Sequence, residues 1–114
     1  MNEIECCVET GAGWHALIEE MNKEMRAIGV DFRFAQIKEK FGALRVYIAP
    51  ECEDATFRTN DERVESLYEI IKKYEEMSKH VCEKCGLDNA NQVVIDGWAQ
   101  TLCQKCEKIK IEKK

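Results

Sequence analysis

The cysteines near the C-terminal end constrain this chain more than any other feature. Two Cys-x-x-Cys pairs, Cys82–Cys85 and Cys103–Cys106, are separated by seventeen residues. This spacing is typical of structural zinc sites, in which four sulfur ligands surround one ion as a tetrahedron. Gly86 can supply the positive φ that a turn after the first pair needs, and Asp96-Gly97 predicts a hairpin turn that returns the second pair to the first. We therefore expect one structural Zn²⁺ held by a treble-clef-like module over residues 81–114.

Other chemistries of the same cysteines fit less well. A thioredoxin-like redox site needs a single Cys-x-x-Cys in a βαβ unit, whereas this chain has two pairs and no βαβ pattern. Catalytic zinc usually has three protein ligands and an open position, and four cysteines leave none. The His-x-Glu…Pro-Cys-x-x-Cys pattern of zinc deaminases is also absent. Sulfur ligation by itself does not separate zinc from iron, so that choice stays open at the level of the ligands.

The remainder of the chain predicts an α+β fold in which a helix, a β-hairpin and a second helix precede the zinc module. Apolar spacing predicts helices over 14–28 and 61–79, and β-branched and aromatic residues predict strands over 31–38 and 44–49, joined near Gly42. Residues 1–80 would form the α+β core, packed with 81–114 as one compact unit. The predicted core side chains, with Trp98 beside the metal, are Trp14, Leu17, Ile18, Met21, Met25, Ile28, Val64, Leu67, Tyr68, Ile71, Tyr74 and Met77.

Two local features refine that prediction. Residues Thr59 to Glu62 have the form of a capping box, which would begin the second helix. In the first strand Phe32 and Phe34 share one phase, whereas Ala35 and Ile37 share the other. Either a β-bulge switches the phase or both faces of the strand are covered.

Four sequence blocks occur in a fixed order along the chain: GWHALI from 13, QIKEKFGALRVY from 36, SKHVCEKCG from 78 and GWAQTLCQKC from 97. Together they resemble a family of small, uncharacterised bacterial and phage proteins that pair a similar hairpin with a C-terminal zinc finger. The chain departs from the family pattern at Ala43, where a second glycine is common, and at Cys106, where a histidine can serve. The resemblance implies the fold, one zinc ion and a phage or mobile-element setting, and it implies no enzymatic activity.

The predicted hairpin also carries a candidate ligand-binding surface, formed by Gln36, Lys38, Lys40, Arg45 and Tyr47. Cationic and hydrogen-bonding groups on a sheet suit phosphate or single-stranded nucleic acid, although a solvated strand face is the plainer interpretation. The lysines from 105 to 114 fit a solvated terminus better than a nucleic-acid contact, because no aromatic residues are interleaved with them. A second metal site built from Cys6, Cys7, Cys52 and His15 is disfavoured, since adjacent cysteines chelate one ion poorly.

The bulk properties decide between function classes. The net charge of −5 argues against nucleic-acid binding by the overall field, while leaving room for a local cationic patch. The chain shows no signal peptide and no apolar run long enough to cross a bilayer, so a cytoplasmic protein without a membrane partner is expected. Phosphate-binding loops and nucleophile motifs are also absent.

These observations favour a non-catalytic, zinc-binding interaction protein. Its setting would be that of a phage or mobile-element accessory factor that binds a host protein, for example an anti-defence factor. The alternative is a nucleic-acid- or nucleotide-binding protein that uses the cationic hairpin, and a small metalloenzyme is the second alternative. A two-stranded hairpin is only marginally stable unless another element or a second copy of the chain packs on it, so the sequence is compatible with a homodimer.

Overall fold

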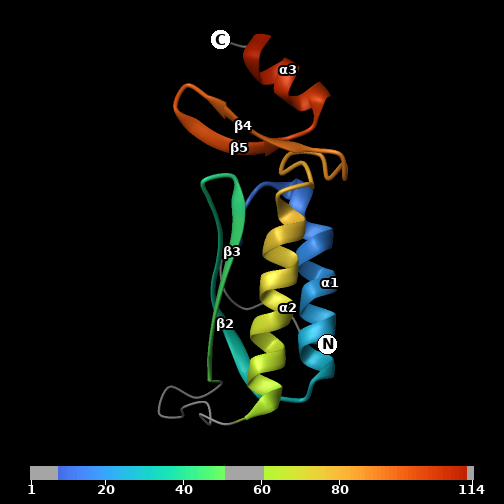
Figure 1. Cartoon of the computed structure of the whole chain (residues 1–114), viewed down its shortest axis with the longest axis vertical. Coiled ribbons are helices and arrows are strands. Elements are labelled where there is room, and N and C mark those ends of the chain that lie inside the picture. Colours follow the sequence, from blue (N-terminus) through green and yellow to red (C-terminus); the bar gives the residue numbers. More distant parts are fainter. Residues whose placement is uncertain (1–7, 51–60, 113–114) are drawn as a thin grey trace.

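The computed structural model describes residues 8–50 and 61–112, and it has a mixed α+β architecture with three α-helices and two sheets among these residues (Figure 1). The elements in chain order are β1 (Val8–Glu9), the 3₁₀ helix η1 (Ala12–Trp14), α1 (His15–Ala27), β2 (Phe32–Lys40), β3 (Ala43–Pro50), α2 (Glu62–Ser78), β4 (Asn91–Ile95), β5 (Trp98–Leu102) and α3 (Gln104–Glu112).

The larger sheet has three strands in the order β1-β2-β3. Strands β2 and β3 form an antiparallel hairpin, and β1 pairs in parallel with β2, with Val8 opposite Ile37. The predicted order of helix, hairpin and helix is therefore not matched, because β1 and η1 precede α1 and the sheet is not a simple hairpin. The short strand escaped prediction because two residues carry no periodicity. Both strands also extend further towards their turn than predicted, because β2 ends at Lys40 and β3 begins at Ala43.

A β-bulge resolves the phase change in β2. The pairing passes from Phe34 opposite Ile48 to Gln36 opposite Tyr47, so Ala35 is the extra residue. Ala35 is exposed, whereas Phe34 before it and Ile37 after it are both buried. The bulge thus keeps one face of β2 directed at the core along its whole length.

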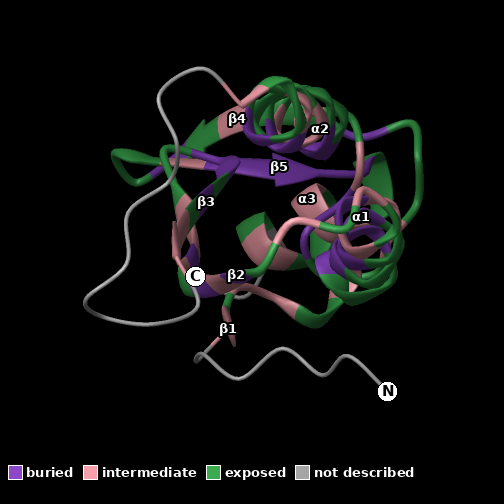
Figure 2. Cartoon of the chain, turned by 90° about the horizontal axis from the view of Figure 1, so that it is seen from below, coloured by how far each residue is buried: buried purple, intermediate pink, exposed green. Residues whose placement is uncertain are grey.

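Helices α1 and α2 pack against each other and against one face of this sheet (Figures 1 and 2). Figure 2 shows the buried stripes of both helices turned towards the sheet. Ile28 is only partly buried, and the prediction of burial is wrong for Tyr68 and Met77, which are 50% and 40% exposed. These two residues flank the buried stripe of α2, and Ser78 occupies the last buried position in place of Met77. The buried side chains of the two helices are Leu17, Ile18, Met21, Asn22, Met25, Val64, Leu67, Ile71, Tyr74 and Ser78.

Side chains of α2 also cover the free edge of β3. The backbone N–H of Leu44 donates to Ser78 Oγ at 2.9 Å, and that of Val46 donates to Glu75 Oε2 at 3.0 Å. An uncovered edge strand is a template for pairing with another chain, so these two bonds block that route over the middle of β3.

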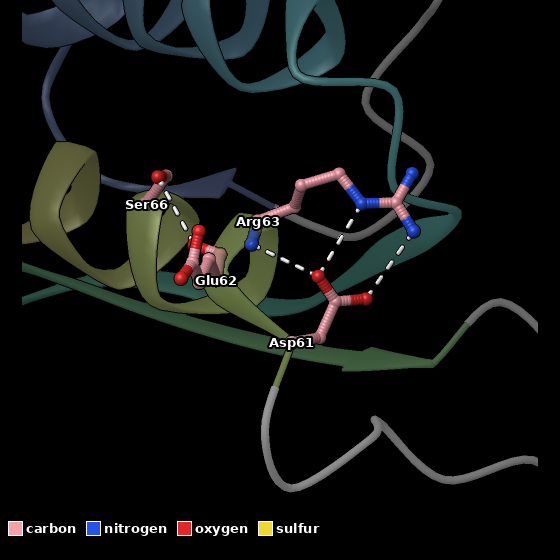
Figure 3. Close-up of polar contacts among 4 residues, drawn as sticks. All are labelled: Asp61, Glu62, Arg63 and Ser66. Carbon is pink, nitrogen blue, oxygen red and sulfur yellow. Dashed lines mark hydrogen bonds and ion pairs between the residues drawn. The ribbon is translucent and has the colours of Figure 1, made fainter.

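Helix α2 begins at Glu62 with Asp61 as its N-cap (Figure 3). Asp61 Oδ1 accepts from the backbone N–H of Arg63 at 2.9 Å, and the Arg63 side chain pairs with the same carboxylate at 3.3 Å. The predicted capping box is wrong in its placement, because it needs Glu62 at the third helical position and Glu62 is the first. Thr59 itself lies outside the described residues. An aspartate is as good an N-cap as a threonine, and Asp61 is the residue that directly precedes α2.

The C-terminal module, residues 81–112, is stacked on the end of the hairpin and helices instead of beside them (Figure 1). The principal extents of 49, 26 and 23 Å and the radius of gyration of 15.6 Å reflect this arrangement, since a compact domain of this length would have a radius of about 13 Å. No helix in the described part of the chain has the length and apolar content to span a bilayer.

Candidate metal centre and cationic sheet face

The four cysteines of the two pairs come together at the centre of the C-terminal module. The Sγ atoms of Cys82, Cys85, Cys103 and Cys106 all lie within 4.8 Å of one another. The sulfurs of Cys85 and Cys103 are 3.6 Å apart, and none of the four forms a disulfide. Sulfurs bound to one Zn²⁺ at about 2.3 Å would sit about 3.8 Å apart in a tetrahedron. The donor set and its spacing therefore fit one four-coordinate metal ion.

The first pair lies in a tight turn held by the backbone. The N–H of Gly86 donates to the Cys82 carbonyl at 2.9 Å, and the N–H of Cys82 donates to the Leu87 carbonyl at 2.8 Å. Gly86 has φ +85°, as the sequence predicted for the residue that follows the pair. The turn presents two sulfurs on one side because the chain doubles back between them.

The β4–β5 hairpin and the start of α3 position the second cysteine pair, Cys103 and Cys106. Asp96 and Gly97 have φ values of 53° and 81°, the geometry of a type I′ turn, so the predicted hairpin is present. Cys103 directly follows β5, and Cys106 lies in the first turn of α3. The N–H of Cys106 is 3.5 Å from Cys103 Sγ, which places a helix N-terminal donor against a cluster sulfur.

The surroundings of the cluster separate the pKa values of its thiols. Burial raises the pKa of Cys82, but backbone N–H groups of Cys103, Cys85 and Lys84 more than offset it, and the pKa falls to about 6. Burial and hydrogen bonds to the other three sulfurs raise the pKa of Cys106 to about 12. Four thiolates this close would repel one another, so full ionisation of the set needs a cation among them.

The turn of the first pair also docks on the N-terminal elements through close backbone contacts. The N–H of Gly13 donates to the Glu83 carbonyl at 3.0 Å, and a Cβ at Gly13 would lie 2.1 Å from the Cys82 carbonyl oxygen. A Cβ at Gly11 would lie 2.2 Å from the Glu83 carbonyl oxygen. Gly11 and Gly13 thus let the loop before α1 lie directly on the turn of the first cysteine pair.

A second contact joins the module to the tip of the β2–β3 hairpin. Thr101 Oγ1 donates to the Gly42 carbonyl, and a Cβ at Gly42 would lie 3.1 Å from the backbone of Gln100. The buried Glu83 carboxylate lies at this junction, and its Oε2 has no hydrogen-bond partner among the described residues. Burial and the nearby Glu39 carboxylate raise the pKa of Glu83.

The other face of the β1–β3 sheet carries the predicted ligand-binding surface, which we call the cationic face. No described helix covers it (Figures 1 and 2). The register pairs Lys38 with Arg45 and Gln36 with Tyr47, while Lys40 lies in phase with Lys38 at the end of β2. Arg33, opposite Ala49, extends the same face and was missed in the sequence because it lies on the other side of the bulge. The cationic face therefore consists of Arg33, Gln36, Lys38, Lys40, Arg45 and Tyr47.

The cations of this face form no ion pair with a described residue. The ion pairs among the described residues join Arg63 to Asp61, Lys73 to Glu24 and Lys79 to Glu76, so none involves the cationic face. Glu9 on β1 lies opposite Lys38 and is the one carboxylate that the described strand register places on this side. Four cations and one carboxylate make the described part of this face positive on a chain whose net charge is negative.

Two aromatic residues of the described structure are largely exposed, and one of them departs from the sequence prediction. Trp98 is 74% exposed at the start of β5, so its prediction as a core residue beside the metal is wrong. Trp98 is the first residue of β5, beside the Asp96-Gly97 turn, and it lies on the opposite strand face from Thr101, which contacts the hairpin tip. Phe41, in the turn between β2 and β3, is 71% exposed at the hairpin tip.

The remaining candidates do not build a site in the described structure. His15 is exposed at the start of α1, while Cys6, Cys7 and Cys52 lie outside the described residues. In the lysine-rich tail, Lys105 and Lys108 are exposed, but Lys110 donates from Nζ to Gln100 Oε1 and so joins α3 to β5. Lys113 and Lys114 lie outside the described residues.

Comparisons of the chain with protein-family models, with curated proteins and with solved structures found no match.

Proposed function

We propose that this chain is a non-catalytic, zinc-binding interaction protein whose cationic face binds an anionic ligand. In this proposal Cys82, Cys85, Cys103 and Cys106 hold one Zn²⁺ in a treble-clef-like module, and the ion has a structural role. Zinc supplies a tetrahedral centre that four thiolates complete, which leaves no open position for a substrate. The metal would fix the module on the hairpin tip and on Gly13, and thereby fix the shape of the hairpin.

The observation that carries the ligand proposal is the pairing of Lys38 with Arg45. Like charges directly opposite each other on neighbouring strands are destabilising. This pair persists on a face that no described helix covers. Glu9 of β1 lies opposite Lys38, yet neither Lys38 nor Arg45 has an ion-pair partner among the described residues. A bound anion would relieve the repulsion, because it places negative charge between the two side chains.

Retention on immobilised heparin, a polyanion, tests this proposal. The wild-type protein loaded with zinc should be retained at low salt, and Lys38→Glu with Arg45→Glu should elute at a clearly lower salt concentration. The matched control is Lys23→Glu with Lys72→Glu, which changes the net charge equally at exposed positions on α1 and α2. Equal loss in both double variants, or no retention of the wild type, would overturn the proposal.

The metal proposal has its own readout. Mass spectrometry of metal content should give one zinc per chain, and X-ray absorption should give four sulfur neighbours. An iron content, or a shell with fewer than four sulfurs, would contradict it. This measurement also tests the metalloenzyme alternative, since a catalytic zinc would show an oxygen or nitrogen neighbour.

A second candidate function, the binding of a host protein by a phage or mobile-element accessory factor, is favoured by the exposure of Trp98. Exposed tryptophans are enriched at protein interfaces, where they act as anchors. If this candidate is correct, capture of a bacterial protein from a nuclease-treated lysate should depend on Trp98 and should survive Lys38→Glu with Arg45→Glu. Capture that disappears after nuclease treatment would argue against it.

A further inference from the structure

Two exposed aromatic rings accompany the cations of the cationic face. Tyr47 is 47% exposed in the middle of β3, and Lys38 Nζ lies 5.8 Å from the centre of its ring. Phe41 is 71% exposed at the turn, and Lys40 Nζ lies 5.6 Å from the centre of its ring. Each ring therefore has a cation beside it, and both remain accessible to a planar ligand.

The backbone of Phe41 makes its exposure more informative. Phe41 has φ 54°, a left-handed conformation that is unusual for a bulky residue and favours Asn, Asp or Gly. The second hairpin of the same chain has nearly the same geometry, with the more ordinary Asp96 at φ 53°. An aromatic residue at the first position is strained and apolar in water, so its presence calls for a role outside folding.

We infer that the cationic face binds single-stranded nucleic acid, with bases stacked on Tyr47 and Phe41 and phosphates held by Lys38, Lys40 and Arg45. The inference rests on the proposed function and names the class of its anionic ligand. Sheets that bind single strands combine a positive track for the backbone with aromatic rings on which bases stack. Gln36, opposite Tyr47, adds a hydrogen-bonding side chain beside the stacking position.

The same features separate a single strand from other anions. In a duplex the bases are stacked on each other, so the rings of Tyr47 and Phe41 would have no base to receive. An acidic peptide would use the cations but would gain little from two exposed rings. The aromatic residues, and not the cations, therefore decide between these ligands.

Fluorescence anisotropy with the zinc-loaded full chain and a labelled twelve-nucleotide probe tests the inference. Oligo-dT and oligo-U should both bind more tightly than the corresponding duplex and more tightly than poly-glutamate. The logarithm of the binding constant should fall with the logarithm of salt concentration with a slope of about −2 if three cations contact phosphates. Lys38→Ala with Arg45→Ala should reduce the magnitude of that slope by about 1.4.

Aromatic variants test the stacking directly. Tyr47→Ala should weaken oligo-dT binding by about tenfold, whereas Tyr47→Phe should retain it, because stacking needs the ring and not the hydroxyl. Phe41→Asn should weaken binding similarly without straining the turn, since Asn accepts the left-handed conformation. Tyr68→Ala is the matched control, because Tyr68 is equally exposed but lies on α2. Zinc content and thermal melting of each variant establish that it is folded.

The outcomes distinguish the inference from the proposed function. If oligo-dT does not bind better than poly-glutamate, and Tyr47→Ala has no effect while Lys38→Glu with Arg45→Glu still abolishes heparin retention, the inference is wrong and the proposed function stands. If neither heparin nor any oligonucleotide binds, both are wrong. If Tyr68→Ala weakens oligo-dT as much as Tyr47→Ala does, binding lies elsewhere and the inference is overturned.

Discussion

The indole Nε1 of Trp14 donates a hydrogen bond of 2.8 Å to the backbone carbonyl of Val81, which lies 67 positions further along the chain. Trp14 is fully buried at the start of α1, and Val81 directly precedes the first cysteine pair. Together with the contact of Gly13 with Glu83, this bond makes the metal-binding turn part of the packing around α1. The cysteine cluster and the N-terminal elements are therefore coupled structurally.

Removal of the metal should accordingly change the environment of Trp14. In a Trp98→Phe background Trp14 is the only tryptophan, so its fluorescence reports on this junction alone. Addition of a zinc chelator should shift its emission to longer wavelength, because the turn that covers the indole loses its metal and unfolds. Structural zinc contributes about 10–16 kcal/mol in small finger peptides, which is comparable with the stability of a whole domain.

Restoration of zinc should reverse the shift. Unchanged Trp14 emission and unchanged near-ultraviolet circular dichroism in a chain shown to be metal-free would contradict the coupling. If the Trp14 emission shifts while the β4–β5 hairpin keeps its structure, the disturbance lies at the junction between the cysteine turn and α1, and the C-terminal module remains folded.

Gly13→Ala should both destabilise the protein and weaken metal binding. The added Cβ would lie 2.1 Å from the Cys82 carbonyl oxygen and 2.7 Å from the Glu83 carbonyl carbon, and backbone atoms cannot move aside cheaply. We expect a loss of about 3 kcal/mol in the free energy of unfolding, measured by urea denaturation, and faster loss of zinc to a competing chelator.

Gly29→Ala is the control for this substitution. Gly29 has φ +88° and open space around its would-be Cβ, so alanine there is strained by conformation alone. It should cost about 1 kcal/mol and leave zinc affinity unchanged. Equal effects of the two substitutions on zinc affinity would show that Gly13 is not a contact of the metal-binding turn.

The parts of this structure that were predictable from sequence are those encoded by near neighbours. The cysteine spacing predicted which sulfurs meet, and Asp96-Gly97 predicted the turn between them, because each signal depends on a few adjacent residues. The burial of Leu17, Met21 and Leu67 followed from helical periodicity in the same way.

The features that were not predictable depend on which elements face each other. Periodicity placed Tyr68 in the core, but whether a residue beside the main stripe is covered depends on the width of the sheet it meets. Trp98 was assigned to the core for its size, although nothing described lies over the end of its hairpin. The closeness of Gly13 to Glu83 could not be inferred either, since a glycine is equally expected before a helix for reasons of the turn alone.

Ser78→Ala should destabilise the protein although it removes only one oxygen atom. Ser78 is fully buried; its Oγ accepts from the N–H of Leu44 at 2.9 Å and donates to the Glu75 carbonyl. Alanine would leave the Leu44 N–H buried without a partner, which costs about 1–3 kcal/mol. Urea denaturation of Ser78→Ala and of Ser66→Ala should differ by about this amount, because Ser66 is bonded to Glu62 in an exposed position. Similar stabilities would mean that water replaces the Ser78 hydroxyl.

Asp61→Ala should lower the thermal midpoint by removing the N-cap of α2. Asp61 directly precedes the first residue of α2, and its carboxylate accepts a hydrogen bond from the backbone N–H of Arg63. Hydrogen bonds from the Arg63 side chain and from its backbone N–H also hold the pKa of Asp61 below its usual range. Asp61→Asn should retain most of the wild-type midpoint, because asparagine caps helices about as well as aspartate does. If Asn and Ala lower the midpoint equally, the ion pair with Arg63 and not the cap stabilises this end of the helix.

Protonation of Glu24 should weaken the contact between α1 and α2. Glu24 accepts from Lys73 Nζ at 2.7 Å through one oxygen and from the Tyr74 hydroxyl through the other. The hydrogen bonds from Lys73 and Tyr74 lower the pKa of Glu24 from its usual value of 4.5. A lowered pKa in the folded state means that the unfolded chain takes up the proton first as the pH falls. The stabilisation is thus fully present above pH 4.5 and is lost as the pH falls through the folded-state pKa.

The difference in unfolding free energy between the wild type and Glu24→Gln isolates this contribution from other acid-sensitive groups, the metal ligands included. Because the Glu24 side chain is 40% exposed, solvent screening limits the difference to about 1 kcal/mol or less at pH 7. It should shrink as the pH falls below 4.5. Glu19→Gln, at an exposed position of the same helix and outside the described ion pairs, should show no such trend. A Glu24→Gln difference that stays constant from pH 7 to pH 3 would show that the carboxylate charge does not stabilise this contact.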